Sequence, residues 1–167
     1  DEPDDQFMLR DSFLKGISLL VKFNLVYEIL IFIRHLPYAA KLVEKFPEQK
    51  FVLDHIAKPL IRDKLLSPWR EGIQQLAFHP NVYCKLSGMV TEASWTGWRK
   101  EDFTPYLDVI FESFGPSRLM IGSDWPVCTV ASGYHETMQI VIDYIGGSSQ
   151  NDQELILGRN AKIIYNL

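Results

Sequence analysis

The sequence has no hydrophobic run that could cross a lipid bilayer. Its longest apolar stretch, residues 17–33, is interrupted by Lys22, Asn24 and Glu28. A membrane-spanning helix needs about 20 consecutive apolar residues, so these three polar side chains argue against one. We therefore predict no contact with a membrane and interpret the stretch as a helix followed by a strand. No secretory signal and no Asn-X-Ser/Thr glycosylation site is recognisable.

Cysteine is scarce. Cys84 and Cys128 are the only two in 167 residues, and their spacing is not that of a metal site. This excludes a disulfide framework and a cysteine-based zinc site. We predict reduced thiols in a cytoplasmic protein.

The sequence also lacks the signatures of nucleic-acid and nucleotide binding. There is no run of Lys and Arg, and the formal net charge is −4, so we expect no nucleic-acid partner. The Gly-X-Gly-X-X-Gly, Walker, Gly-X-Ser-X-Gly and His-Glu-X-X-His motifs are all absent.

What is present is a regular alternation of strand and helix patterns. The length and the 47% hydrophobic content fit one globular domain covering residues 1–167. Short apolar runs predict strands, and amphipathic segments bounded by Pro and Gly predict helices. The predicted strands are residues 26–32, 51–53, 82–86 and 119–121, and the predicted helices are residues 12–23, 37–47, 67–79, 105–114, 134–145 and 152–165. This order predicts an α/β fold with a parallel sheet and right-handed crossovers.

Polar side chains follow the predicted strands rather than precede them. Asp124 comes just after the last strand, where Gly122 frees the backbone and Pro126 prevents a helix from starting. The carboxyl ends of parallel strands are where ligands bind, so Asp124 is a candidate general base. Alternatively, it caps the turn that follows.

A second polar cluster follows the strand 51–53. His55 can hold a metal ion or polarise a carbonyl group, although a lone histidine can also be a satisfied core residue. Strand alternation points Asp54 away from His55, toward the helix layer or a neighbouring strand. Lys58 lies in the loop beyond them.

Four further residues are candidate substrate contacts. Arg34 and His35 follow the first strand, and Trp125 follows Asp124. Arg34 can clamp a carboxylate or a hydroxyl, or be an ordinary surface residue. Lys85 lies inside the third strand. Burying its charge there costs free energy unless the ammonium is paired or extends past the helix layer.

At these positions the chain resembles a known family. The resemblance rests on Phe51-Val-Leu-Asp-His-Ile-Ala-Lys-Pro59, Asn81-Val-Tyr-Cys-Lys-Leu-Ser-Gly88 and Arg118-Leu-Met-Ile-Gly-Ser-Asp-Trp-Pro-Val127, with support from Phe32-Ile-Arg-His-Leu-Pro37 and Gly158-Arg-Asn-Ala161. These motifs are similar to the last strands of the amidohydrolase-related family, which includes L-fuconolactonases, L-rhamnonolactonases and 2-pyrone-4,6-dicarboxylate lactonases.

The resemblance implies a fold and a reaction. The fold is a (β/α)₈ barrel, of which the chain corresponds to the C-terminal half. Asp124 matches the base that deprotonates the hydrolytic water, and His55 matches the residue that faces the lactone carbonyl. Five further residues are implied to lie at the mouth of the barrel as substrate contacts: Arg34, His35, Lys58, Lys85 and Trp125.

The resemblance also bears on cofactors and partners. The family's His-X-His strand has no counterpart here. No cofactor is expected to be required, and His55 and Asp124 are metal ligands only if the complete barrel holds a divalent ion such as zinc.

The expected small-molecule partner is a lactone. A half barrel exposes sheet edges, so we expect self-association or pairing with a missing N-terminal half. Two alternatives remain open: an inactive interaction module, and a self-contained flavodoxin-like or receiver-like domain that uses Asp54 or Asp124 to hold magnesium.

Overall fold

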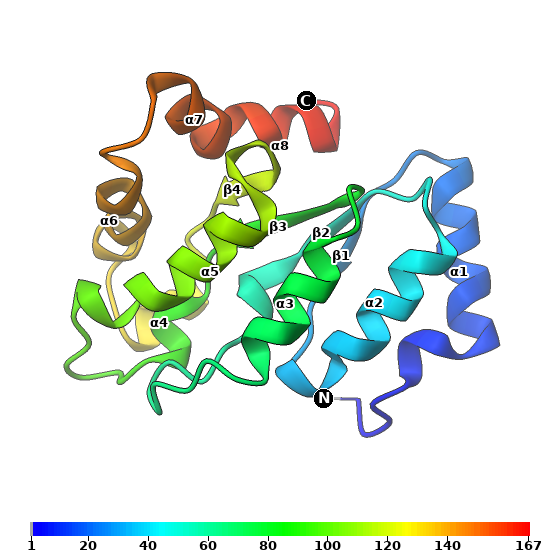
Figure 1. Cartoon of the computed structure of the whole chain (residues 1–167), viewed down its shortest axis with the longest axis horizontal. Helices are drawn as coiled ribbons and strands as arrows, with labels where there is room; N and C mark the ends of the chain where they lie inside the picture. The colour runs from blue at the N-terminus through cyan, green and yellow to red at the C-terminus, as the bar shows by residue number, and fades with distance from the viewer. Residues whose placement is uncertain (1) are drawn as a thin grey trace.

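The computed structural model describes residues 2–167 and contains one four-stranded parallel sheet (Figure 1). The strands are β1 (Tyr27–Ile29), β2 (Phe51–Leu53), β3 (Val82–Leu86) and β4 (Leu119–Ile121). They lie side by side in the order β1-β2-β3-β4, which is the order of the chain. Tyr27 pairs with Phe51, Phe51 with Val82, and Cys84 with Leu119. The predicted parallel α/β fold is confirmed.

Helices pack on both faces of the sheet, and the main helical layer lies on one of them. The α-helices are α1 (Asp11–Lys22), α2 (Leu36–Lys45), α3 (Trp69–Ala77), α4 (Met89–Glu92), α5 (Thr104–Phe114), α6 (Tyr134–Ile145), α7 (Gln150–Glu154) and α8 (Asn160–Tyr165). Figure 1 shows α2, α3 and α5 side by side in front of the strands. Pro37 lies in the first turn of α2, as predicted, where a missing backbone N–H costs nothing. Gly115 ends α5 with φ of 67°.

Strand alternation divides the side chains between two environments. On one face, four fully buried side chains point toward the helices and belong to the main core: Ile29, Leu53, Cys84 and Leu119. The opposite face carries a smaller cluster of Val52 and Met120, which α8 covers through Ile164. Charged residues of the strands also lie on this opposite face, as described below.

Two of the predicted elements differ markedly in the structure, and the short helix α4 was not predicted. The first strand is Tyr27–Ile29 rather than residues 26–32, because it pairs only with the three residues of β2 before β2 ends. The last predicted helix is broken into α7, a wide π turn (Leu155–Arg159) and α8. Asn160 explains the break, since its buried side-chain amide donates to the carbonyls of Pro116 (2.8 Å) and Leu119 (2.7 Å) and anchors α8 to β4.

The sheet does not close on itself. In the part of the chain that the structure describes, β1 and β4 each pair with one strand only. The order also does not reverse, unlike that of a doubly wound sheet, where ligands bind at the point of reversal. No helix within residues 2–167 has the length and hydrophobicity that a bilayer span requires.

Candidate functional site

The residues that follow β2, β3 and β4 meet at the carboxyl-end edge of the sheet. His55 Nε2 lies 3.5 Å from Asp124 Oδ1, and His55 Nδ1 lies 2.8 Å from the Ser87 hydroxyl. The side chains of His55 and Asp124 are only 18% and 17% exposed. The two residues singled out from the sequence as catalytic are therefore brought together. Ser87 was missed, and the only signal for it was its place directly after a strand.

A left-handed turn directs His55 to this position. Residues 55–58 all have positive φ, between 46° and 58°, and they include the β-branched Ile56. Left-handed geometry costs about 1–2 kcal/mol for each L-residue, so the surrounding structure must hold the turn. Trp69, buried at the start of α3, does so by donating its indole N–H to the Ile56 carbonyl at 2.7 Å.

Backbone geometry also sets the position of Asp124, the other member of the pair. The Gly122 N–H donates to the Leu86 carbonyl at 3.2 Å, which extends the pairing of β3 and β4 by one residue. Asp124 then adopts a positive φ of 56°, and its carbonyl accepts from the Cys128 N–H at 2.9 Å. These contacts fix the start of the loop that carries the carboxylate.

Burial favours the neutral form of His55. Burial lowers the pKa of its imidazole, and this outweighs the opposing effect of Asp124 and Asp54. A neutral imidazole has one nitrogen that donates a hydrogen bond and one that accepts. It can therefore polarise a carbonyl oxygen without carrying a net charge.

Lys85 lies on the face opposite α2, α3 and α5, within an ion-pair network. Its Nζ is 2.8 Å from Glu28 Oε1 and 3.0 Å from Asp54 Oδ1, and Tyr165 donates its hydroxyl to Glu28 at 2.6 Å. Burial alone would lower the pKa of Lys85, but the two carboxylates raise it above its usual range. Asp54 thus faces a neighbouring strand, as one of the sequence alternatives proposed.

Burial also raises the pKa of two other members of this network. The pKa of Asp54 moves upward, mainly because of desolvation. Desolvation, together with the bond to Glu28, raises the pKa of Tyr165 to about 12. The network joins β1, β3 and α8 to Asp54, the residue that follows β2 and precedes His55.

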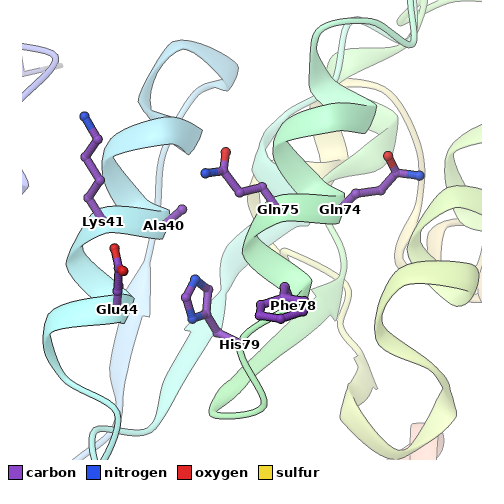
Figure 2. Close-up of a pocket in the computed structure, with 7 residues that line it drawn as sticks. All are labelled: Ala40, Lys41, Glu44, Gln74, Gln75, Phe78 and His79. Carbon is purple, nitrogen blue, oxygen red and sulfur yellow. The ribbon is translucent and has the colours of Figure 1, made fainter.

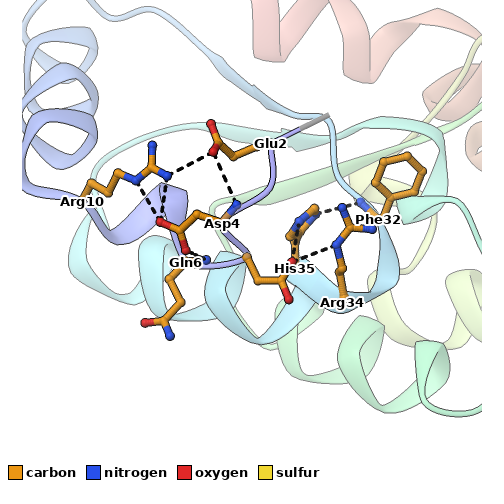
Figure 3. Close-up of polar contacts among 8 residues, drawn as sticks. Glu2, Asp4, Gln6, Arg10, Phe32, Arg34 and His35 are labelled. Carbon is orange, nitrogen blue, oxygen red and sulfur yellow. Dashed lines mark hydrogen bonds and ion pairs between the residues drawn. The ribbon is translucent and has the colours of Figure 1, made fainter.

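Arg34 and His35 are engaged by the N-terminal segment (Figure 3). Asp5 Oδ1 lies 2.8 Å from Arg34 Nε and 3.4 Å from His35 Nε2. His35 is buried, and its Nδ1 accepts a hydrogen bond from the Phe32 N–H at 3.2 Å. Burial, followed by the charge of Arg34, lowers the pKa of His35. In this structure His35 therefore holds the loop after β1.

Lys58 and Trp125 are close in sequence to the two members of the His55–Asp124 pair. Lys58 ends the left-handed turn, with its ammonium 4.9 Å from the centre of the Phe32 ring. Trp125 is 65% exposed beside Asp124. Both residues belong to the segments that follow β2 and β4, at the carboxyl-end edge of the sheet.

The described donors do not make a complete metal site. Within residues 2–167, no group of three or more His, Cys, Asp or Glu side chains is arranged to hold an ion. Catalytic zinc takes three protein ligands and keeps one position open, whereas His55 and Asp124 supply two. Residues 2–167 therefore fit part of such a site only.

A separate hollow of about 410 Å³ lies on the outer surface between α2 and α3 (Figure 2). Its lining residues are Ala40, Lys41, Glu44, Gln74, Gln75, Phe78 and His79. None of them contributes to the His55–Asp124 pair, which lies at the strand ends. We therefore place the candidate site at the strand ends.

Comparison with known proteins identifies the family of this chain. A family model described as "Amidohydrolase" matches residues 1–167. The L-fucono-1,5-lactonase of Burkholderia multivorans is 40% identical over 151 residues, which are 84% of this chain and 51% of that protein. The L-rhamnono-gamma-lactonase of Scheffersomyces stipitis is 26% identical over 149 residues, which are 76% of this chain and 44% of that protein. The chain thus spans about half the length of these curated relatives.

A solved structure matches the whole fold. It is an amidohydrolase from Burkholderia multivorans, crystallised with bound zinc, and it superimposes with a TM-score of 0.94 at 37% identity. The match covers 100% of this chain and 62% of that one. The structural neighbours are (β/α)₈ barrels, so the four strands described here are half of such a barrel, as predicted. Since the family model covers every residue, this chain belongs to the amidohydrolase family.

Proposed function

We propose that the protein hydrolyses the ring ester of a sugar-acid lactone. The observation that carries the proposal is the convergence of His55 Nε2 and Asp124 Oδ1, 3.5 Å apart at the carboxyl ends of parallel strands. Its support from comparison is the 40% identity to an L-fucono-1,5-lactonase.

The proposed reaction begins with Asp124 accepting a proton from water. The water oxygen then bonds to the ring carbonyl carbon, and the carbonyl oxygen takes up negative charge. A neutral His55 donates its Nε2–H to this oxygen, which stabilises the charge as it develops. When the ring C–O bond breaks, Asp124 returns its proton to the leaving ring oxygen. The product is the open-chain hydroxy acid.

Five residues are proposed to contact the substrate. Trp125, which is exposed at the mouth, can pack against the sugar ring and limit the access of bulk water. Lys58 adds a cation beside the carbonyl. The other three, Arg34, His35 and Lys85, already contact carboxylates of this chain. To bind a substrate, each would have to contact the substrate in addition to its carboxylate or in place of it.

No metal is proposed to be required, because His55 and Asp124 alone supply the donor and the base in this scheme. Chelation with EDTA is expected to leave turnover unchanged. A loss of turnover on chelation that zinc restores would contradict this part of the proposal.

The proposed partner of this half barrel is a further set of strands that closes the sheet at β1 and β4. Barrels remove the free edges of a sheet, and both edges are free in the described chain. A second copy of the chain, or the N-terminal half of a longer one, can supply these strands. The alternative is an inactive chain that binds partners through the same edges.

The test is hydrolysis of a panel of 1,5- and 1,4-aldonolactones by the protein expressed from its complete gene, followed by acid release. We expect turnover of at least one six-carbon lactone, and no turnover of simple aryl esters or amides. A folded protein that opens none of the lactones would rule out the proposed activity and favour the interaction module.

A further inference from the structure

Ser87 contacts the candidate catalytic histidine but has no part in the proposed reaction. It follows β3, is 3% exposed, and places its hydroxyl oxygen 2.8 Å from His55 Nδ1. A hydroxyl can either donate to an imidazole nitrogen or accept from it. The direction of this one bond depends on which nitrogen of neutral His55 carries the proton.

Two glycines allow the contact to form. A Cβ atom on Gly88 would lie 2.7 Å from both Cβ and Cγ of His55, so the ring packs directly on the backbone there. A Cβ atom on Gly122 would lie 3.1 Å from Cβ of Ser87. Ser87 is therefore confined between the ring of His55 and the end of β4.

Electrostatics select the direction of the bond. His55 Nε2 faces Asp124 Oδ1 at 3.5 Å. A proton on Nε2 is attracted by the carboxylate, whereas a lone pair on Nε2 would face the lone pairs of the oxygen. Burial strengthens this preference, since it weakens solvent screening. The favourable arrangement has Ser87 donating to Nδ1 and His55 carrying its proton on Nε2.

We propose that Ser87 is a positioning residue that donates its hydroxyl to Nδ1 and so holds the ring of His55 in the tautomer that Asp124 favours, with the proton on Nε2. The effect on activity rests on the proposed lactone hydrolysis. The tautomer itself does not, because it is a property of the protein without substrate.

The experiment is ¹⁵N NMR of the histidine rings near neutral pH, in the presence of EDTA, with the His55 signals assigned by comparison with His55→Asn. Protonated and unprotonated ring nitrogens of neutral imidazole have well-separated ¹⁵N shifts. The variants are Ser87→Ala, which removes the hydroxyl, and Ser87→Thr, which keeps it. Ser113→Ala is the matched control, because it removes a hydroxyl that donates to the Val109 carbonyl on α5.

We expect wild type, Ser87→Thr and Ser113→Ala to show a protonated Nε2 and an unprotonated Nδ1. Ser87→Ala is expected to keep a protonated Nε2, because Asp124 remains, but to change the ¹⁵N shift of the unprotonated Nδ1, because the hydrogen bond from the Ser87 hydroxyl is lost. In turnover of a lactone, Ser87→Ala should lower kcat by about 10-fold, as lost support of a functional histidine typically does, with KM little changed. Ser87→Thr should restore kcat.

A protonated Nδ1 in the wild type would overturn the proposal, as would an unchanged Nδ1 shift in Ser87→Ala. If the shifts are as expected but no lactone is opened by any variant, the proposed activity fails while the role of Ser87 in holding the ring of His55 stands.

Discussion

His55 Nε2 lies 3.5 Å from Asp124 Oδ1 although the two residues follow strands that are not neighbours, since β3 lies between β2 and β4. Adjacent strands are about 4.8 Å apart, so the backbones of β2 and β4 are separated by roughly twice that distance. The left-handed turn after Asp54 carries His55 over the end of β3, where it rests on Ser87 and Gly88. The pair therefore depends on the backbone of three strand ends.

Gly88→Ala is expected to lower both stability and activity. Gly88 has a φ of +63°, and an added Cβ would collide with His55 at 2.7 Å. The left-handed backbone alone costs about 1–2 kcal/mol for alanine. Displacement of His55 should additionally reduce kcat, measured on a lactone that the wild type turns over.

Gly115→Ala serves as the control for backbone strain. Gly115 has a φ of +67° with no atom within 4 Å of an added Cβ, and it lies at the end of α5. This variant should lose stability but keep wild-type kcat. If Gly88→Ala kept full kcat while folded, His55 would not depend on this contact.

Lys85→Met is expected to destabilise the fold by on the order of 2 kcal/mol, measured by denaturant unfolding. The change leaves Glu28 and Asp54 without their shared cation, and the partly exposed position of Glu28 reduces the cost below that of a fully buried pair. The control is Lys64→Met, whose exposed ammonium lies 3.5 Å from Asp102, and it should change stability by less than about 0.5 kcal/mol. A Lys85→Met protein of normal stability with a raised KM would instead show that Lys85 serves the substrate.

The pH dependence of stability should report on His35. Its pKa is lowered from 6.5, chiefly by burial. As pH falls below about 6.5, the unfolded chain takes up a proton before the folded chain does, so the free energy of unfolding decreases. Denaturant unfolding of His35→Asn at about pH 7.5 and about pH 5.5 should show a smaller decrease than in the wild type. Part of the decrease should persist, because burial lowers the pKa of His55 as well. Equal decreases in the two proteins would contradict this assignment.

The 167-residue chain, expressed on its own, is expected to self-associate. β1 and β4 each lack a second neighbour within the described residues, and exposed hydrophobic side chains flank β1, namely Leu25 and Leu30. Free strand edges and exposed apolar side chains favour association. Sedimentation velocity at low micromolar concentration should show dimers or larger species. A compact, soluble monomer would refute the expectation.

The sequence predicted the strands and the order of the elements because the signals for both are local. Alternating apolar residues, Pro37 and Gly115 predict where helices and strands begin and end. The break in the last helix was not predictable, because it depends on Asn160 binding carbonyls beside β4, far away in the sequence.

The arrangement of the candidate site was predicted in part. Asp124 and His55 were found because polar residues at the ends of buried strands are unusual. The left-handed turn was not found, since Ile56, Ala57 and Lys58 carry no local preference for a positive φ and are held there by tertiary contacts such as the bond from Trp69. The partners of Arg34, His35 and Lys85 also come from distant segments.

The most direct test of the account is a double-mutant cycle on His55 and Asp124, measured as kcat for a lactone that the wild type opens. We expect Asp124→Asn and His55→Asn each to lower kcat by about 10²–10⁴-fold in folded protein. Because the two groups act in one step, the double variant should lose about as much as the more severe single variant, not the product of the two losses. Wild-type kcat in Asp124→Asn would contradict the central claim that this carboxylate activates the water.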